Sequence, residues 1–348
     1  MNKKPSTIND IAKLAGVSKT TVSFALNNPG RVGAETLANI RKICKELNYS
    51  PDPIARTLTT KKTGNIGFLL PGITPEGFKN PHLFQILQGM RIACLSDDYS
   101  LTVISPSRGN LLKTMQKLAV DGFVIHGMIH QMEIFDYLRT RNIPVVSLDG
   151  GVLEPIPRVT TDDEVGAYNV MQLVLSYGHK NIVILGFKDA DDHKEEFASS
   201  AGYRRLQGYK RALSEKNIGS HSPGISVFIS EECSLDGGYT AMEQIWKSSK
   251  RPTAIVAMSD ILAMGVYSFC QDHSLSIPEN LSVVGFDDIM EVSLIRPPLT
   301  TISQPAVKKG EKAVELLIEI IKGSKNPASV ELKTELIKRQ SVAIPSVG

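Results

Sequence analysis

The chain has 348 residues, of which 42% are hydrophobic and 22% charged, with a formal net charge of +3, a composition that excludes disordered and collagen-like proteins. The four cysteines, at positions 44, 94, 233 and 270, share no short spacing, so neither a disulfide framework nor a zinc ribbon is predicted. The N-terminus lacks the apolar core of a signal peptide, and no apolar run reaches the ~20 residues of a membrane span, so we expect a cytoplasmic protein with no membrane partner.

The positive charge is concentrated at the N-terminus. Residues 1–63 contain eleven Lys and Arg against four Asp and Glu, a net charge of +7, so residues 64–348 carry the remaining −4. A small basic segment on a mildly acidic body favours a polyanion as the partner of that segment alone. The alternative is a charged surface that only faces solvent.

The residues after Thr7 predict two short helices around a tight turn, followed by a third helix. Thr7 and Asp10 have the spacing of a capping box for the first helix, which Gly16 ends, and Ser18 is a natural N-cap for the second. The predicted helices cover about 8–15, 19–26 and 34–48. Such a helix-turn-helix leaves the start of its second helix able to enter the major groove of DNA. An αα-hairpin with a purely structural role has the same periodicity.

Two prolines limit the segment after the third helix. Pro51 and Pro53 stop that helix, which leaves about six to eight residues for a hinge helix from Pro53 to about Thr60. So short a helix is not stable alone in water. We therefore expect it to fold mainly when docked on DNA and on its two-fold mate.

Two segments, TINDIAKLAGVSKTTVSFALNN from Thr7 and the later YSPDPIARTL, closely resemble the DNA-binding head and hinge of the lac-repressor (LacI/GalR) family of bacterial transcription regulators. The resemblance continues to the C-terminus. It implies that Lys19, Thr20 and Phe24 face base edges. Lysine can donate to guanine and threonine can pack its methyl group on thymine, whereas phenylalanine offers only apolar contact. The alternative for Phe24 is a half-buried core aromatic.

The resemblance also implies contacts to phosphate and to the minor groove. The polar residues that it places near phosphate are Ser18, Thr21, Ser23 and Asn27, and Thr7 belongs to the same DNA-binding set. Leu58 is the residue that wedges between base pairs, with Ala55 packed close beside it. A leucine wedge costs unstacking energy, which the bent and widened groove offsets. The alternative for Leu58 is an anchor onto the rest of the chain.

From Gly64 onward, apolar β-rich runs such as NIGFLLPG and NIVILGF alternate with amphipathic segments of helical length. Continuous apolar runs with helical crossovers predict parallel sheets that are buried on both faces. About four such runs precede residue 160 and four follow, which favours two similar α/β lobes. They resemble the periplasmic sugar-binding-protein fold that forms the family's effector domain.

The expected fold class is therefore α/β, with a three-helix helix-turn-helix head and a hinge helix joined to a two-lobed, periplasmic-binding-protein-like effector domain. The expected domains are the head at 1–50, the hinge helix and linker at 51–63, and the effector-binding and dimerisation domain at 64–348. Within the last we expect a first lobe at about 64–160 and 291–323, a second lobe at about 161–290, and C-terminal strands at 324–348.

Polar residues gather where open α/β sheets bind ligands, beyond the carboxyl ends of strands. Four acids end or follow strand-like runs, and Arg205 stands where the family commonly has an effector-binding arginine. The candidate effector-binding residues are Phe84, Asp149, Asp162, Arg205, Asp260 and Asp287. Carboxylates with one guanidinium suit a polyhydroxylated or amide-bearing small molecule. Each acid alone could instead cap a helix or end a strand.

An enzyme is the main alternative class, but the chain contains no phosphate-loop, dinucleotide-binding, zincin or serine-hydrolase motif. His126 and His130 have a metal-like helical spacing but flank Gly127 at a strand exit, so we expect neither a metal nor a cofactor. A freestanding transport protein would leave the basic head unexplained.

The sequence thus predicts a cytoplasmic, DNA-binding transcriptional regulator that is not an enzyme and is, by resemblance, a repressor rather than an activator. We expect a homodimer on near-palindromic, double-stranded operator DNA. A small-molecule effector, a sugar or related metabolite bound between the lobes, would control it. The effector's identity, the direction of the response, the operator sequence, and the choice between dimer and tetramer stay open.

Overall fold

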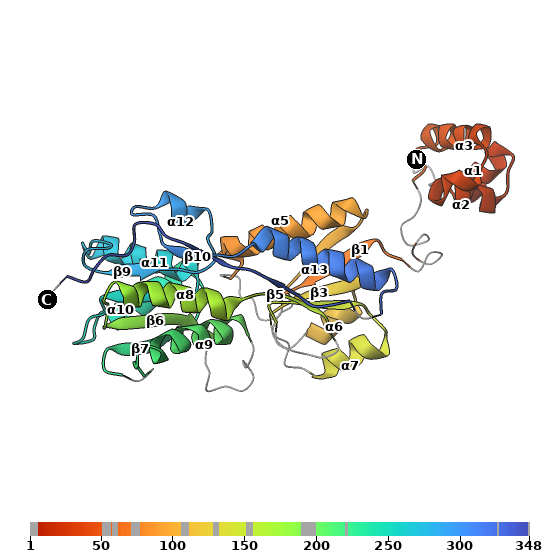
Figure 1. The fold of residues 1–348 in the computed structure, drawn as a ribbon. Coiled ribbons are helices and arrows are strands. Elements are labelled where there is room, and N and C mark those ends of the chain that lie inside the picture. The colour runs from red at the N-terminus through yellow and green to blue at the C-terminus, as the bar shows by residue number, and fades with distance from the viewer. Residues whose placement is uncertain are drawn as a thin grey trace. The chain divides into compact units, whose positions relative to one another are not determined.

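The computed structural model divides the chain into two compact units, residues 1–63 and 64–348, drawn as a ribbon in Figure 1. The structure describes residues 6–50, 57, 62–70, 77–105, 111–127, 132–150, 156–188, 200–219, 222–325 and 327–346. The expected hinge helix, including Ala55 and Leu58, lies outside these described residues apart from Thr57.

The N-terminal unit contains α1 (Ile8–Ala15), α2 (Lys19–Asn27), the 3-10 turn η1 (Pro29–Arg31) and α3 (Ala34–Glu46). The backbone N–H and the hydroxyl of Thr7 both donate to Asp10 Oδ2 at 2.8 Å, so the predicted capping box is confirmed. Gly16 ends α1 with a φ of +66°, a left-handed conformation that glycine adopts without strain.

A small apolar core joins these three helices. Ile11 of α1, Val22 of α2 and Ile40 of α3 are fully buried within it. The helices α1 and α2 with their glycine turn therefore form the predicted helix-turn-helix, which α3 closes. The third helix ends before the predicted residue 48, because Asn48 takes a left-handed φ of +48° that cannot continue an α-helix.

The larger unit contains two parallel sheets, as the continuous apolar runs predicted. The first sheet has the strand order β11-β5-β4-β3-β1-β2, and all of its neighbouring strands are parallel. Its strands are β1 (Asn65–Leu69), β2 (Ser100–Ile104), β3 (Gly122–His126), β4 (Val145–Leu148), β5 (Arg158–Thr161) and β11 (Val330–Leu332).

Helices cover both faces of this first sheet, and sheet and helices together form the first lobe. On one face lie α5 (Pro81–Ser96) and α13 (Ala306–Ile321), which pack on Phe68 and Val146. On the other lie α6 (Leu111–Gln116) and α7 (Met132–Thr140), packed around Phe123. Figure 1 shows the two helix layers on opposite sides of the strands, and the short turn η2 (Gly77–Lys79) precedes α5.

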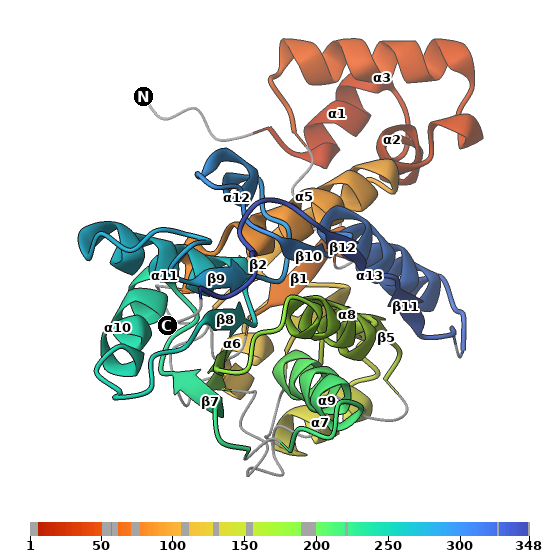
Figure 2. The same ribbon diagram turned by 60° about the vertical axis from the view of Figure 1, so that its left-hand side comes forward.

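The second lobe repeats this layered plan. Its parallel sheet, β7-β6-β8-β9, is built from β6 (Ile182–Phe187), β7 (Ile225–Ser230), β8 (Ala254–Ala257) and β9 (Ser282–Val284). One face carries α8 (Asp163–Ser176) and α9 (Ala201–Ser214), and the other carries α10 (Leu235–Ile245) and α11 (Asp260–Asp272). Figure 2 shows α8 beside α9 and α10 beside α11.

The chain crosses between the lobes between β5 and α8, between β10 (Thr301–Ser303) and α13, and between β11 and β12 (Glu335–Ile337). The strands β10 and β12 pair antiparallel. The short helix α12 (Glu291–Leu294) precedes β10, and its Val292 packs with Leu299 in the second-lobe core. The expectation that the first lobe resumes at 291 is therefore corrected: the second lobe extends to β10, because these apolar side chains find their core there.

Candidate functional site

The second helix of the head, α2, has one side that faces away from the head's core. Lys19 and Thr20 are exposed and Phe24 is half-buried, whereas Val22 and Ala25 on the opposite side are buried. The three residues predicted to contact bases thus share the side of α2 that does not pack in the head's core. Major-groove binding requires this placement.

Phe24 is not among the residues of the head's hydrophobic core, contrary to the core-aromatic alternative. Its ring lies beside the η1 turn, and the guanidinium carbon of Arg31 is 5.4 Å from the ring centroid. An exposed arginine over an aromatic ring contributes about 0.5–1 kcal/mol. Phe24 is therefore held in place from outside the core, at the surface of the head.

The candidate phosphate contacts also stabilise α2. Ser18 Oγ accepts a hydrogen bond from the backbone N–H of Thr21 at 3.0 Å, and the two hydroxyl oxygens are 2.9 Å apart. Asn27 Nδ2 donates to Ser23 Oγ at 3.4 Å. Each of these side chains has a local structural role, to which a contact with phosphate would be added.

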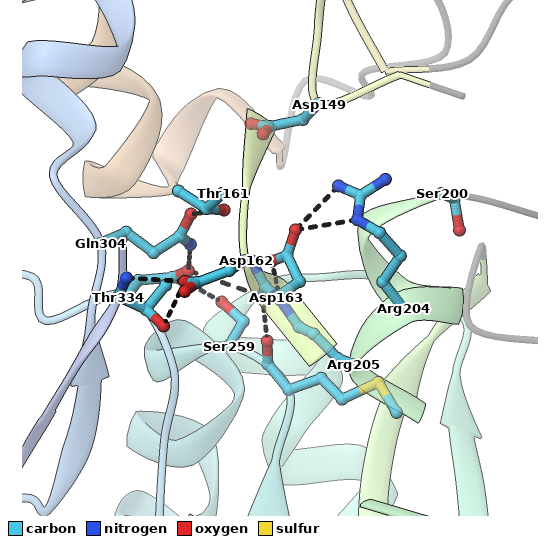
Figure 3. A network of polar contacts seen from close by, with 12 residues as sticks. Asp149, Thr161, Asp162, Asp163, Ser200, Arg204, Arg205, Ser259, Gln304 and Thr334 are labelled. Atoms are coloured by element: carbon cyan, nitrogen blue, oxygen red, sulfur yellow. Dashed lines mark hydrogen bonds and ion pairs between the residues drawn. The ribbon is translucent and has the colours of Figure 1, made fainter. Parts of the chain in front are cut away.

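Figure 3 shows a second candidate site, a buried polar cluster at the carboxyl ends of strands from both lobes. Asp163, the first residue of α8, is fully buried and pairs with Arg204 Nη2 at 2.7 Å and Arg205 Nε at 2.9 Å. Arg205 Nη1 lies 3.6 Å from Asp287 Oδ1, and its guanidinium carbon is 3.8 Å from the Phe286 ring centroid. Burial disfavours the charge of Arg205, but the two carboxylates raise its pKa, so it stays protonated at neutral pH.

Asp287 is held from several directions. It is 3% exposed and accepts hydrogen bonds from Ser259 Oγ at 2.8 Å and from Gln304 Nε2 at 2.6 Å. Its φ of +132° is rare for a residue with a side chain, and its backbone N–H donates to Ile302 at 2.8 Å. Residues kept in such conformations concentrate at functional sites, so Asp287 is a strong candidate for contact with a ligand.

Asp260 is fully buried and already has partners. Its carboxyl oxygens accept hydrogen bonds from Thr301 Oγ1 at 2.6 Å and from the backbone N–H of Ile289 at 3.0 Å. Burial and the nearby carboxylate of Asp287 raise its pKa to about 8. Through these hydrogen bonds Asp260 connects α11 to the segment that leads into β10.

Asp162 has a similar role at another crossing. Its Oδ1 accepts from the backbone N–H of Thr334 at 2.7 Å and from the Thr334 hydroxyl at 2.8 Å, and Lys333 Nζ lies 3.3 Å from Oδ2. These contacts, of which Figure 3 shows those between Asp162 and Thr334, join the crossing after β5 to the crossing after β11. Asp162 thus fastens two interlobe segments together.

Asp149 lies on the first-lobe side, directly after β4, and is 8% exposed. Its two carboxylate oxygens are 3.0 and 2.8 Å from Lys309 Nζ, and His126 Nε2 is 3.8 Å away. Burial disfavours the charge of Asp149, but Lys309 and His126 hold its pKa below the usual range. Lys309 Nζ also donates to Gln304 Oε1 at 2.7 Å, so Gln304 connects Asp149's partner with Asp287.

Phe84 is separate from these contacts: it lies on α5 and is 57% exposed. Its neighbour His82 is buried, and burial lowers its pKa to about 4. Among the described residues His82 Nδ1 has no hydrogen-bond partner, which leaves a neutral imidazole nitrogen available. His130 lies outside the described residues, and the described part of the chain contains no group of three His, Cys, Asp or Glu that could hold a metal ion.

Sequence reasoning missed several members of the cluster, namely His82, Asp163, Arg204, Gln304 and Lys309. Two of them stand directly beside predicted residues, Asp163 after Asp162 and Arg204 before Arg205. Lys309 carried a signal of its own, because it falls on the apolar face of α13 with Gly310 and Ala313. A lysine in that position needs a buried acceptor.

Comparison with known proteins connects both sites to a family. The profile for bacterial regulatory proteins of the lacI family matches residues 7–52, and that for a periplasmic binding protein-like domain matches residues 171–342. The chain is 32% identical, over 97% of both chains, to the HTH-type transcriptional repressor PurR of Yersinia pestis bv. Antiqua. The chain belongs to the lacI family of bacterial regulatory proteins. It is a helix-turn-helix transcriptional regulator and not an enzyme.

Solved lacI-family structures share the fold. A lac repressor dimer bound to operator and the anti-inducer ONPF matches with a TM-score of 0.82 and 25% identity, over 98% of this chain and 100% of that one. A regulator from Enterococcus faecium with bound ribose matches with a TM-score of 0.71 and 26% identity, over 81% of this chain and 100% of that one. No helix within the described ranges is long and apolar enough to cross a membrane.

Proposed function

We propose that the chain represses transcription by binding near-palindromic, double-stranded operator DNA as a homodimer, and that a small-molecule effector controls this binding. The observation that carries the proposal is the outer side of α2, which presents Lys19, Thr20 and Phe24 from a segment of net charge +7. The relative named as a repressor and the lac repressor dimer solved on its operator support it. A regulator of this kind works in the cytoplasm, where bacterial DNA lies.

In this proposal the head, residues 1–50, reads DNA and residues 51–63 form the hinge. Lys19, Thr20 and Phe24 contact base edges. The phosphate contacts come from Thr7, Ser18, Thr21, Ser23 and Asn27. Leu58 enters the minor groove with Ala55 beside it, and the short helix that carries them folds on DNA.

The effector site of the proposal lies between the lobes, with Asp149 on the first lobe and Arg205 and Asp287 on the second. Acids and bases of the cluster are paired with one another, Asp149 with Lys309 and Asp163 with Arg205. A charged ligand would leave a buried charge unpaired, which is costly. An uncharged, polyhydroxylated ligand avoids that cost, and ribose bound to the related regulator agrees with such a class.

The remaining candidates support this site in different ways. Asp162 and Asp260 fix the interlobe segments that form its walls, through Thr334 and Thr301. Phe84 stays a candidate contact at the start of α5. The domain that holds the site, residues 64–348, also dimerises.

We place the dimer contact on the first-lobe face formed by α5 and β2. Ile92 and Leu95 of α5 are 44% and 60% exposed, and Val103 of β2 is 42% exposed. β2 is an edge strand of its sheet. Apolar residues gathered on one exposed face are typical of a protein contact surface, and the occupant we propose is the same face of a second copy.

Selection of duplexes from a random-sequence pool by the full chain tests the function. We expect enrichment of one near-palindromic sequence, and genomic footprinting should then find it upstream of genes. A thermal-shift screen of sugars and nucleobases tests the effector class, with an uncharged sugar expected to raise the melting temperature. A pool without any enriched sequence would contradict the proposal.

A further inference from the structure

Lys309 is a charged residue inside a hydrophobic layer, and neither the sequence motifs nor the proposed function accounts for it. It is 1% exposed and lies on α13 among the apolar residues that cover the first sheet. We propose that Lys309 is a positioning residue that couples the two walls of the effector site and passes changes at that site to the exposed face of α5 in the first lobe. The proposal rests on the proposed effector site between the lobes.

The ammonium group of Lys309 is fully used. Its three donors have three acceptors, the two oxygens of Asp149 at 3.0 and 2.8 Å and Gln304 Oε1 at 2.7 Å. A buried charge is kept only where its partners are complete, and removal of one partner costs several kcal/mol. The position of Lys309 is therefore fixed by the first-lobe acid and by the crossing segment that carries Gln304.

The amide of Gln304 makes this connection directional. Its oxygen accepts from Lys309 Nζ and its nitrogen donates to Asp287 Oδ1 at 2.6 Å. The opposite orientation would place the NH2 group against an ammonium and the oxygen against a carboxylate, so it is excluded. Thr161 Oγ1, 3.2 Å from Gln304 Oε1, adds a contact on the same side. Lys309 and Asp287 thus hold one rigid amide from opposite lobes.

The relay continues beyond Asp287 into the second lobe. Asp287 lies 3.6 Å from Arg205 Nη1, and Arg205 pairs with Asp163 at the start of α8. A ligand that takes a hydrogen bond from Arg205 or donates one to Asp287 changes what Gln304 binds. The change then reaches Lys309 through a single amide group.

On the first-lobe side, Lys309 is placed to move α5. The neighbouring backbones of α13 and α5 touch: a Cβ on Gly310 would lie 2.1 Å from Ile86 O, and a Cβ on Gly89 would lie 1.8 Å from Val307 O. Figures 1 and 2 both show the two helices side by side. Helices in direct backbone contact shift together rather than independently, so a shift of α13 at Lys309 reaches the exposed face of α5.

The simpler alternative is an ion pair that only stabilises the first lobe. The two roles differ in which segments lose local stability when the ammonium group is removed. Loss of a local ion pair affects only β4 and α13. Loss of a coupling residue also affects residues 285–289 around Asp287 in the other lobe and the whole of α5. The local stability of segments that do not contact Lys309 is therefore the measurement that separates the two roles.

Amide hydrogen exchange on the full chain, without DNA or ligand, measures this. In Lys309→Met we expect exchange at residues 285–289 and in α5 to become about tenfold faster or more, which corresponds to about 1.4 kcal/mol of local opening. The control is Lys308→Met, at the neighbouring exposed lysine that pairs with Glu311 at 2.9 Å, and it should leave both segments unchanged. Changes confined to β4 and α13, or equal in the two variants, would overturn the proposal.

A second variant keeps the test decisive if Lys309→Met does not fold. Gln304→Leu removes the relay but leaves the contacts between Lys309 and Asp149. It should speed exchange in the same two segments. Because residues 285–289 contain Asp287, a direct partner of Gln304, the decisive segment is α5, and unchanged exchange there would overturn the coupling. Because the measurement uses neither operator nor effector, its failure differs from failure of the proposed function, which would appear as absent DNA selection.

Discussion

The carboxyl group of Asp260 makes the stability of the second lobe depend on pH. Burial, together with the nearby carboxylate of Asp287, raises the pKa of Asp260 to about 8 from an ordinary value of 3.8. In the unfolded chain this group loses its proton near pH 4. Between about pH 4 and pH 8 the native state therefore binds one more proton than the unfolded state, so Asp260 lowers the free energy of unfolding as pH rises through that window.

The effect is large enough to measure with Asp260→Asn, which cannot ionise and keeps one oxygen for Thr301 or Ile289. One pKa unit corresponds to about 1.4 kcal/mol, so ionisation of Asp260 costs on the order of 5 kcal/mol by pH 8. Urea unfolding can be followed through the single tryptophan, Trp246, which packs against the second-lobe core. We expect the stability of the variant relative to wild type to rise by several kcal/mol between pH 5 and pH 8.

Other buried groups titrate in the same range with the opposite sign. Burial lowers the pKa of His82, His126 and His179, so the unfolded chain binds protons that these native histidines do not. The difference between variant and wild type removes this shared contribution. Asp136→Asn, at an exposed acid of α7, serves as the matched control. A stability difference that is the same at pH 5 and pH 8 for Asp260→Asn would refute the reasoning.

Three further outcomes are expected. Lys19→Ala should weaken binding to the selected operator by roughly 1–3 kcal/mol and relax base preference, as fluorescence anisotropy would measure; equal weakening on every sequence would reassign Lys19 to phosphate. Gly89→Ala should destabilise the first lobe by about 3 kcal/mol or more in thermal unfolding, because its methyl group would lie 1.8 Å from Val307 O. Gly30→Ala, where nothing lies within 4 Å, is its control and should be nearly neutral. Amide exchange at residues 53–60 should become protected only with operator, and full protection in the free protein would rule out coupled folding of the hinge.

The parts of the fold that were predictable from sequence are those with local causes. The capping box of Thr7 and Asp10 and the left-handed Gly16 define α1 within ten residues of chain. The parallel sheets follow from uninterrupted apolar runs, since strands buried on both faces need no polar side. Lobe membership of α12 was not local, because it depends on where Val292 finds apolar neighbours.

The candidate effector site was predictable in its location but not in its contacts. Parallel strands bring their carboxyl ends, and the first turns of the helices that follow them, to one edge. This is why Asp287, which follows β9, meets Arg205 of α9. Which acid fastens a crossing depends on partners far away in the chain: Asp162 bonds Thr334 at a separation of 172 residues, and Asp260 bonds Thr301 at 41. Spacing within the sequence carries no information on such pairs.

The central claim is that a basic helix-turn-helix head gives this chain its affinity for operator DNA. The most direct test compares the full chain with residues 64–348 on the selected duplex, by fluorescence anisotropy over a series of salt concentrations. We predict that the full chain binds with an affinity that falls steeply as salt rises, because the net charge of +7 in residues 1–63 displaces counterions from phosphate. The shortened chain, with its net charge of −4, should not bind. Binding retained by residues 64–348, or an affinity of the full chain that does not change with salt, would contradict the account.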